Sequence, residues 1–274
     1  EVRPARPLPA QPAEPAERGL RFEGVTFAYP GTERKVVDGL DLWVPAGSSL
    51  AVVGENGAGK TTLVKLLARF YDPDEGRITL DGVDLRDLDL DALRARMAVI
   101  FQDFVRYQLS ARDNVGFGAV GRADQPLLDR AAAAVGVLER IRAFPDGWDT
   151  VLAREFGGVD LSGGEWQRVA LARAMMAQLG RNADLLVLDE PTASLDVRVE
   201  HELYEQFADL SRDRTTLLVS HRFSTVRMAG RIVLLADGRV AEDGSHDELI
   251  TAGGRYAALY ELQASHYRRT GVLE

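Results

Sequence analysis

The sequence lacks several features, and each absence excludes a class of protein. It has no cysteine in 274 residues, which excludes disulfide frameworks, thiol catalysis and cysteine-based zinc sites. No apolar run approaches the ~18 residues needed to cross a bilayer. Acidic residues outnumber basic ones and give a net charge of −9, which is unfavourable for binding a nucleic-acid backbone. We therefore expect a globular chain that neither spans a membrane by itself nor binds nucleic acid.

Lysine is scarce, and proline is concentrated in one segment. Lys35, Lys60 and Lys65 are the only lysines beside thirty arginines, so a lysine inside a motif is informative. Five of the eleven prolines lie in the first eighteen residues, which favours an extended segment without a core. That segment also lacks the apolar stretch of a signal peptide. We interpret residues 1–18 as a linker from an upstream transmembrane domain and residues 267–274 as a C-terminal tail.

Short strands alternate with helices along the rest of the chain. Apolar runs bounded by turn residues predict the strands, and helical periodicity predicts the helices. Buried strands alternating with helices indicate an α/β fold with a mainly parallel sheet. The expected strands are Leu20–Phe27, Asp41–Val44, Ser49–Val53, Arg77–Leu80, Ala98–Phe101, Leu185–Leu188, Thr215–Val219 and a hairpin over Ile232–Glu242; the expected helices are Lys60–Phe70, Leu90–Arg96, Ala123–Phe144 with a break near Gly136, Gly164–Leu179, Val197–Leu210, a short one capped by Ser245, and Arg255–Ala264.

One glycine-rich segment has the pattern of a phosphate-binding loop. It fits G-x-x-x-x-G-K-[ST] between a predicted strand and a predicted helix. Its backbone N–H groups would converge on a phosphate, Lys60 would contact the β- and γ-phosphates, and Thr61 would ligate Mg²⁺. The simpler alternative is a glycine turn before an ordinary helix. The segment reads Gly54-Glu55-Asn56-Gly57-Ala58-Gly59-Lys60-Thr61, followed by Thr62.

Two acids end a strand that the sequence predicts to be buried. Asp189 and Glu190 follow the apolar run Leu185–Leu188. Beside a phosphate-binding loop, Asp189 is suited to hold Mg²⁺, and Glu190 is suited to polarise the attacking water as a general base. Without such a loop, two acids at a strand end would be read as an ordinary solvated terminus. The phosphate-binding loop therefore decides the interpretation in favour of catalysis.

Further motifs occur in an order that resembles the ATP-binding cassette (ABC) family. Leu161–Glu165 is similar to the family's signature pentapeptide, with Glu165 where glutamine is usual. Gln102 resembles the Q-loop glutamine, Ala193–Asp196 the D-loop and His221 the switch histidine. Tyr29 is similar to the aromatic residue that stacks on adenine. The resemblance covers Leu20 to Ala264.

The resemblance implies a role for each of these residues, although each also has a simpler alternative. Tyr29 alone would be a strand tyrosine, Gln102 a loop amide, His221 a solvated loop residue and Ser162 a helix cap. By resemblance the catalytic residues are Glu190, His221, Gln102 and Lys60; the nucleotide contacts are Tyr29, Gly54, Glu55, Asn56, Gly57, Ala58, Gly59, Lys60, Thr61, Thr62, Ser162, Gly163, Gly164, Glu165 and Asp196; the magnesium ligands are Thr61, Gln102 and Asp189.

The resemblance also implies an architecture and partners. The expected fold is a P-loop NTPase with a RecA-like core sheet, an antiparallel β subdomain and a helical subdomain at about 103–179, within a nucleotide-binding domain over 19–266. Two cassettes, identical or different, would dimerise head to tail around two Mg-ATP and couple to a transmembrane domain at the cytoplasmic face of the membrane. The linker favours an exporter; a free-standing importer subunit and a non-transport ABC ATPase are the alternatives.

Two segments depart from the family's usual patterns. Thr150–Glu155 resembles the exporter loop that precedes the signature, but its usual Gly-Glu-Arg-Gly core is altered. Phe104–Tyr107 follows the glutamine without the commoner proline. We interpret Phe104–Tyr107 as lining the groove for a coupling helix; a core-plus-surface segment is the alternative.

Overall fold

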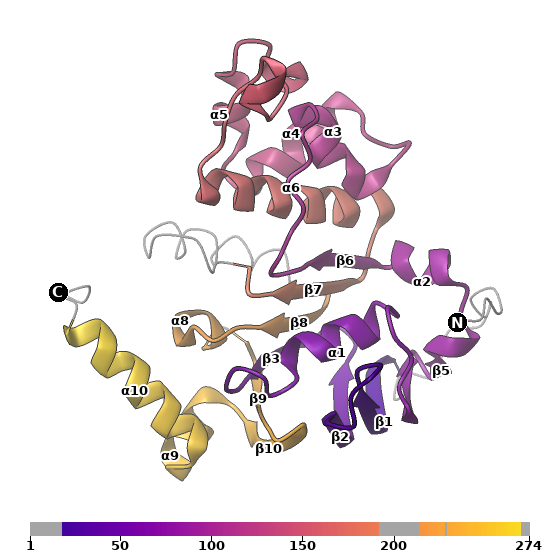
Figure 1. The fold of residues 1–274 in the computed structure, drawn as a ribbon, viewed down its shortest axis with the longest axis vertical. Coiled ribbons are helices and arrows are strands. Elements are labelled where there is room, and N and C mark those ends of the chain that lie inside the picture. The colour runs from indigo at the N-terminus through magenta and orange to yellow at the C-terminus, as the bar shows by residue number, and fades with distance from the viewer. Residues whose placement is uncertain (1–17, 192–213, 228, 270–274) are drawn as a thin grey trace. The chain divides into compact units, whose positions relative to one another are not determined.

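A computed structural model describes residues 18–191, 214–227 and 229–269 of the chain (Figure 1). The described residues form two compact units: one consists of residues up to 90 together with those from 215 onward, and the other of residues 91–214. Both contain helices and strands, in agreement with the predicted α/β class. The expected helix Val197–Leu210 and the segment Ala193–Asp196 lie outside the described residues.

The first unit contains an antiparallel sheet with the strand order β2-β1-β4-β5. Strand β1 (Gly19–Ala28) pairs with β2 (Lys35–Pro45) on one side and with β4 (Glu75–Leu80) on the other, and β4 pairs with β5 (Val83–Asp84). Strand β2 begins well before the predicted Asp41, because shifts of register along β1 keep the two strands paired back to Lys35. Such irregularities interrupt the alternation on which strand prediction depends.

A parallel arrangement forms the core of the same unit. Strand β3 (Ser49–Val53) lies parallel to both β8 (Thr215–Val219) and β9 (Arg231–Ala236). Every residue of β8 is buried, as expected for a strand covered on both faces. Strand β10 (Arg239–Gly244) returns antiparallel to β9 through a turn at Asp237 and Gly238, which confirms the predicted hairpin.

Among its described residues, four helices complete this unit. Helix α1 (Lys60–Leu67) buries Leu63, Val64, Leu66 and Leu67, and α8 (Phe223–Val226) follows β8. Helix α9 (His246–Ala252) carries the predicted capping box of Ser245 with Glu248, and α10 (Arg255–Arg269) extends beyond its predicted end. A 3-10 turn, Leu85–Asp87, follows β5.

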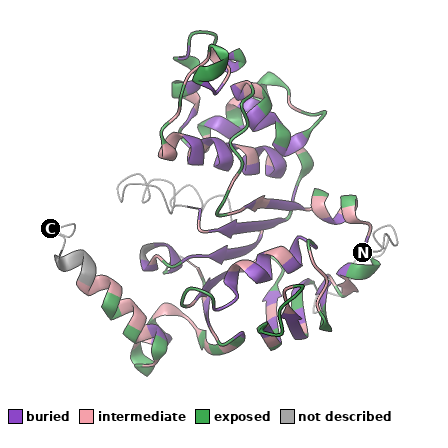
Figure 2. Ribbon diagram, viewed as in Figure 1, coloured by how far each residue is buried: buried purple, intermediate pink, exposed green. Residues whose placement is uncertain are grey.

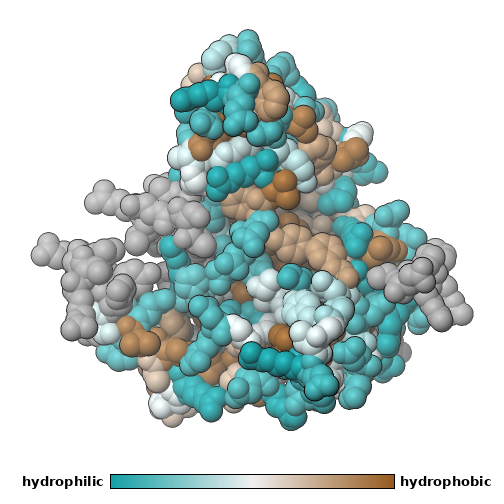
Figure 3. Space-filling view, viewed as in Figure 1, coloured by the Kyte–Doolittle hydropathy of each residue, from teal (hydrophilic) through white to brown (hydrophobic). Residues whose placement is uncertain are grey.

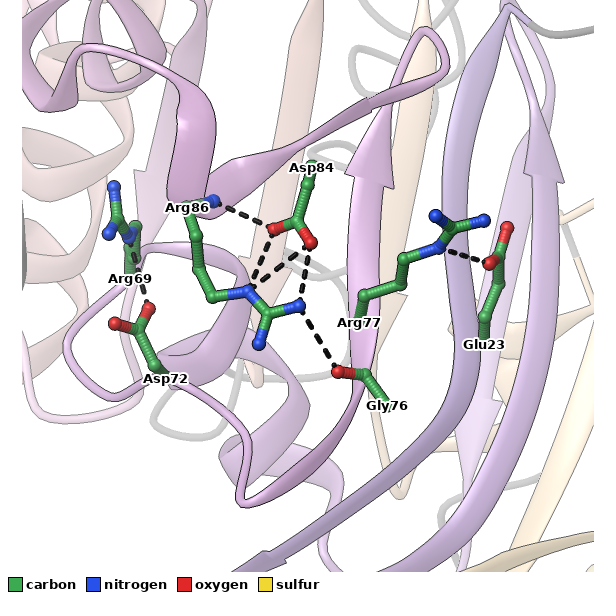
Figure 4. A network of polar contacts seen from close by, with 7 residues as sticks. All are labelled: Glu23, Arg69, Asp72, Gly76, Arg77, Asp84 and Arg86. Carbon is green, nitrogen blue, oxygen red and sulfur yellow. Dashed lines mark hydrogen bonds and ion pairs between the residues drawn. The ribbon is translucent and has the colours of Figure 1, made fainter. Parts of the chain in front are cut away.

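Helix α1 ends earlier than its periodicity predicts. Ala68 is its C-cap, and Arg69 adopts a left-handed backbone with φ of 53°. The buried Arg69 side chain donates to Asp72 at 3.0 Å and to the Leu88 carbonyl at 3.3 Å. One local and one tertiary contact thus hold Arg69 in its position just after the helix. Figure 4 shows the polar contacts around Arg69. Two ion pairs lie nearby: Arg77 of β4 pairs with Glu23 of β1, and Arg86 of the 3-10 turn pairs with Asp84 of β5.

The second unit packs helices around one long helix. Helix α6 (Gly163–Arg181) is buried along most of its length (Figure 2) and contacts α3 (Ala111–Gly116) and α4 (Gln125–Ala133). The predicted break at Gly136 separates α4 from α5 (Leu138–Arg142). Helix α3 was not predicted. The remaining elements are α2 (Leu90–Ala95), the parallel strands β6 (Met97–Ile100) and β7 (Leu185–Asp189), and the 3-10 turns Phe117–Ala119, Gly147–Asp149 and Arg154–Phe156.

Candidate nucleotide site

The loop between β3 and α1 has a backbone that requires glycine at two points. Gly54 has φ of 153° and Gly59 has φ of 102°. A Cβ atom at Gly54 would lie 2.4 Å from the Leu235 carbonyl oxygen, and one at Gly59 would lie 2.8 Å from that of Val36. Any side chain at either position would collide with backbone. The loop therefore packs closely against the backbone of β9 and β2 in its own unit.

Lys60 folds back over this loop. Its side chain is buried, and Nζ donates to the carbonyl oxygens of Gly54 at 2.8 Å and of Glu55 at 2.9 Å. Helix α1 begins directly after Gly59, whose N-cap position offers no side-chain hydrogen bond. The ammonium group and the positive end of the helix thus lie at the same place, which is the arrangement that binds phosphate.

His221 lies at the same edge of the parallel sheet as the loop. Val52 of β3 is paired with Val219 of β8, and each strand continues by two residues, to Gly54 and to His221 respectively. The carboxyl ends of neighbouring parallel strands form the edge at which ligands bind in α/β proteins. A cavity of about 520 Å³ is lined there by Gly54, Glu55, Asn56 and His221, among others. The structure brings the predicted switch histidine to the phosphate-binding loop.

Tyr29 immediately follows β1 and is anchored to helix α1. Its hydroxyl group lies 3.1 Å from the Thr62 hydroxyl group. Its ring makes edge contacts with Phe27 and Tyr71, and the Lys65 ammonium group lies 5.5 Å from its centroid. The aromatic side chain is half-buried. Tyr29 and Thr62, both predicted nucleotide contacts, therefore touch each other.

In the second unit, Gln102 and the two acids follow neighbouring strands. Ile100 of β6 is paired with Leu188 of β7, so Gln102 and Glu190 each lie two residues beyond a matched pair, at one edge. Asp189 is fully buried. Glu190 has a left-handed backbone with φ of 49°, a conformation that costs non-glycine residues roughly 1 kcal/mol and is common at functional sites. Gln167 of α6 donates to the Pro191 carbonyl, directly after these acids.

The signature segment forms the start of helix α6. Ser162 is its N-cap, and its hydroxyl accepts from the Glu165 N–H at 3.3 Å. The Glu165 carboxylate accepts from the Ser162 N–H at 2.8 Å and from Arg140 at 2.6 Å. Burial would raise the pKa of Glu165, but the hydrogen bonds from Ser162 and Arg140 outweigh it, and the pKa lies below its usual range. Gly163 and Gly164 open the first turn. The helix-cap interpretation of Ser162 is confirmed.

Two residues that support the segment after Gln102 were not predicted. The Asn114 amide donates to the carbonyls of Tyr107, Leu109 and Ser110. Arg173 of α6 donates to the Asn114 carbonyl at 2.9 Å and lies 4.8 Å from the centre of the Tyr107 ring. Burial lowers the pKa of Arg173. An arginine within the otherwise apolar run Val169–Ala177 was the available signal.

The surface of the second unit carries exposed apolar side chains. Val105 is 54% exposed, Phe156 63% and Val120 79%. Tyr107 and Phe117 are also exposed, and their rings contact each other in a tilted arrangement with centroids 4.9 Å apart. In Figure 3 such apolar side chains interrupt a largely hydrophilic surface.

The predicted site residues thus form two separate sets. The first unit holds Tyr29, the loop Gly54–Thr62 and His221, and the second holds Gln102, Ser162–Glu165, Asp189 and Glu190. Asp196 lies outside the described residues. In the described part of the chain, no three His, Asp or Glu side chains are grouped to hold a metal, and no helix is long and apolar enough to cross a membrane. The hydroxyl of Thr61, the amide of Gln102 and the carboxylate of Asp189 are the hard oxygen donors that Mg²⁺ prefers.

The comparison with known families decides the assignment. The family model of the ABC transporter matches residues 37–193. The chain belongs to the ABC transporter family. The fold is accordingly that of its nucleotide-binding domain, a P-loop NTPase, as predicted. The chain corresponds to the ATP-binding cassette of that family.

Individual relatives of this ABC cassette are much longer than the chain. An ATP-dependent lipid A-core flippase of Thiobacillus denitrificans is 42% identical over 249 residues, which are 91% of this chain and 42% of that protein. The same-named protein of Alkalilimnicola ehrlichii is 42% identical over 266 residues, 96% of this chain and 44% of its own. A solved structure of a bacterial Atm1-family ABC exporter with ATP bound has a TM-score of 0.83 at 37% identity, covering 95% of this chain and 44% of that one. The chain thus spans less than half the length of these relatives.

Proposed function

We propose that this chain binds Mg-ATP and hydrolyses it to power an exporter whose membrane-spanning part lies in the rest of the protein. The observation that carries the proposal is the meeting of the Lys60 ammonium group, the start of α1 and His221 at one edge of a parallel sheet. That edge combines a phosphate cradle with a group that can hydrogen-bond a γ-phosphate.

The first unit would bind the nucleotide. Backbone N–H groups of Gly57–Lys60 would surround the phosphates, and Lys60 would exchange its two carbonyl partners for phosphate oxygens. The ring of Tyr29 would stack on the adenine, because it is held at α1 by Thr62. The remaining predicted contacts in Gly54–Thr62 line the same loop.

The second unit would supply the groups for hydrolysis. Glu190 would accept a proton from the attacking water, with Gln102 at the same sheet edge to orient that water. Asp189, Gln102 and the Thr61 hydroxyl of the first unit would hold Mg²⁺, whose charge stabilises the phosphoryl oxygens. The left-handed backbone of Glu190 supports this assignment, because strain of this kind is kept where a side chain must be aimed.

A second cassette, of the same or another chain, would complete each site. By family resemblance the signature residues Ser162–Glu165 and the segment containing Asp196 would contact the ATP bound by the opposite cassette. The start of α6 supports this for Ser162, because a helix N-terminus favours a γ-phosphate. The two cassettes would dimerise head to tail at the cytoplasmic face of the membrane. Nucleic acid is not among the proposed partners.

The domain boundaries and the coupling surface belong to the same proposal. We assign residues 1–18 to a linker, 19–266 to the nucleotide-binding domain with its helical subdomain at about 103–179, and 267–274 to a tail. The loop Phe104–Tyr107, held by Asn114 and Arg173, would receive a coupling helix of the transmembrane domain. Its exposed Val105 and Tyr107 support this use. The relatives are named for lipid A-core and for the Atm1 family, so the cassette supports the exporter class rather than a particular cargo.

The decisive experiment replaces the proposed general base. Glu190→Gln keeps the shape of the side chain and removes its basicity, so hydrolysis should slow ~10²–10⁴-fold while ATP affinity stays within about twofold. Single-turnover hydrolysis and equilibrium ATP binding measure the two quantities. Glu75→Gln, the same chemical change at an exposed position on β4, is the matched control. Wild-type hydrolysis by the Glu190 variant would remove this residue from its role.

A further inference from the structure

One side chain of helix α10 holds the backbone on either side of Arg222, directly after the switch histidine. The Gln263 amide oxygen accepts from the Phe223 N–H at 3.0 Å, and its amide nitrogen donates to the His221 carbonyl at 2.8 Å. A single carboxamide therefore makes two hydrogen bonds to backbone groups two residues apart. This geometry fixes the orientation of the intervening peptide units more tightly than either bond alone.

The backbone at this point needs partners from elsewhere. Helix α8 starts at Phe223, and its N-cap Arg222 provides no side-chain cap. The first N–H groups of a helix have no acceptor within the helix. The Ser220 hydroxyl accepts from the Arg222 N–H at 3.0 Å, and Gln263 supplies the acceptor for the next N–H. The loop carrying His221 is thus capped from within by Ser220 and from a distant helix by Gln263.

Helix α10 is itself well anchored at its beginning. The Glu242 carboxylate of β10 accepts from the N–H groups of Arg255 and Tyr256, the first two residues of α10. Tyr256 is fully buried, and its hydroxyl lies 2.8 Å from Nδ1 of His246. The ring of Phe223 meets Tyr256 at 5.2 Å and Tyr260 at 5.4 Å between centroids. The helix is therefore a fixed support on which Gln263 can hold the loop.

Beyond these contacts, α10 is separated from the phosphate-binding loop by open space. Two cavities, of about 690 and 520 Å³, are both lined by Leu259 and Leu262 of α10 and by Glu55 and Asn56 of the loop. Leu262 is 69% exposed, and Figure 3 shows apolar atoms over this helix at the lower left. Although α10 is otherwise separated from the phosphate-binding loop, the Gln263 side chain reaches from this helix to the backbone of His221.

We propose that Gln263 is a positioning residue for hydrolysis: it fixes the His221 loop so that the imidazole is presented to the γ-phosphate. The inference rests on the proposed role of His221. It predicts that loss of both hydrogen bonds affects the chemical step more than nucleotide binding, because the phosphate-binding loop itself is unchanged.

The test measures kcat, KM and ADP affinity for the full transporter carrying Gln263→Leu, which is similar in size and makes neither bond. We expect kcat about tenfold lower, with KM and ADP affinity within about twofold. Ser265→Ala is the control on the same helix, since its hydroxyl donates to the Leu262 carbonyl at 2.7 Å, and it should leave kcat unchanged. A wild-type kcat for Gln263→Leu, or an equal loss of kcat and ADP affinity, would overturn the inference.

A second variant guards against general misfolding. In Gln263→Glu the ionised carboxylate can accept from Phe223 but repels the His221 carbonyl, whereas the protonated acid can make both bonds. Its kcat relative to wild type should therefore rise as the pH falls toward the carboxyl pKa, which is about 4.3 in free glutamate and is raised next to a carbonyl. A constant ratio from about pH 8 to pH 5.5 would contradict a positioning role through this bond.

A double mutant separates this inference from the proposed function. If Gln263 acts through His221, then adding Gln263→Leu to His221→Ala should lower kcat no further than His221→Ala does alone. Additive losses would overturn the inference while leaving the role of His221 intact. If His221→Ala alone hydrolyses ATP at the wild-type rate, the role assigned to the histidine under the proposed function is wrong, and the inference falls with it.

Discussion

The starts of helices α1 and α6 are both proposed to face phosphate, yet they are built differently. At α1 the N-cap is Gly59, which contributes no side chain, and the ammonium group of Lys60 lies beside it. At α6 the N-cap is Ser162, closed into a capping box by Glu165, which also pairs with Arg140. The first helix start has no side-chain cap, whereas the second is already stabilised by its own side chains. We infer that α1 supplies the affinity for nucleotide and that α6 adds to it only within a dimer.

The largest effect is expected from a substitution at the start of α1. Lys60→Ala removes the only positive charge in the loop Gly54–Thr61 and should weaken ATP binding by about 100-fold, since hydrogen bonds to charged groups contribute ~1.5–3 kcal/mol each. Equilibrium binding of a fluorescent ATP analogue measures this loss. Lys65→Ala, one turn further along α1, removes a charge that contacts the Tyr29 ring instead and should cost far less. Equal losses would indicate a general charge effect.

Mixing two inactive variants tests whether the two helix starts act in different chains. Ser162→Arg blocks the start of α6 and Lys60→Ala disables α1, so each variant alone should be inactive. A mixed pair contains one site with both changes and one with neither, so ATPase activity should partly return in a 1:1 mixture. The activity should also rise with protein concentration, because untethered cassettes pair weakly. Concentration-independent activity without rescue would refute the head-to-tail arrangement.

A smaller effect is expected on stability at α6. Ser162→Ala removes the hydroxyl that accepts from the Glu165 N–H and should lower the free energy of unfolding by about 1 kcal/mol, the usual cost of losing a serine cap. Chemical denaturation of the monomer measures it. An equivalent loss of a side-chain cap cannot be produced at α1, because its N-cap is glycine. ATP binding by the monomer should be unaffected, and a loss of binding would mean that α6 contributes to affinity within one chain.

The smallest effect should come from Glu165→Gln. The amide can still accept from the Ser162 N–H but loses the charge that pairs with Arg140, an exposed pair worth about 0–1 kcal/mol. Because the pKa of Glu165 is lowered in the folded chain, its carboxylate stabilises the fold above the unfolded pKa of about 4.3, and this contribution is lost as the pH falls through the lowered value. Urea titrations of both chains should therefore differ slightly at neutral pH and converge in acid. A difference that persisted in acid would exclude the charge as its cause.

Local sequence patterns predicted the parts of the fold in which local forces dominate. Ser49–Val53 and Thr215–Val219 are strands with the predicted bounds, and the turns at Asp237–Gly238 and the break at Gly136 follow directly from their glycines. Tertiary contacts account for the errors. Helix α1 ends early because Arg69 bonds to Asp72 and Leu88, and no periodicity contains that information.

In the candidate site, too, some residues could be predicted from local sequence patterns and others could not. The loop Gly54–Thr61 and the order of the motifs were readable because their chemistry is carried by consecutive residues. The supporting residues were not predicted. Arg173 and Gln263 bond to backbone groups far away in the sequence, and the Asn114 amide bonds to carbonyls of the irregular segment just before its helix. Helix α3 was not predicted, because its six residues, the last of them glycine, are too few to show a helical hydrophobic period. Ser110, which caps it, was the one local sign.

The two hydrogen bonds from Lys60 to backbone carbonyl groups have a consequence for nucleotide exchange. When a nucleotide leaves, the lysine has internal partners to return to, so the loop keeps its shape between successive occupants. Under the proposed function, arriving ATP would have to displace those two hydrogen bonds, which would lower its net affinity. The same two bonds would compete with bound ADP for the lysine and so would favour release of the product.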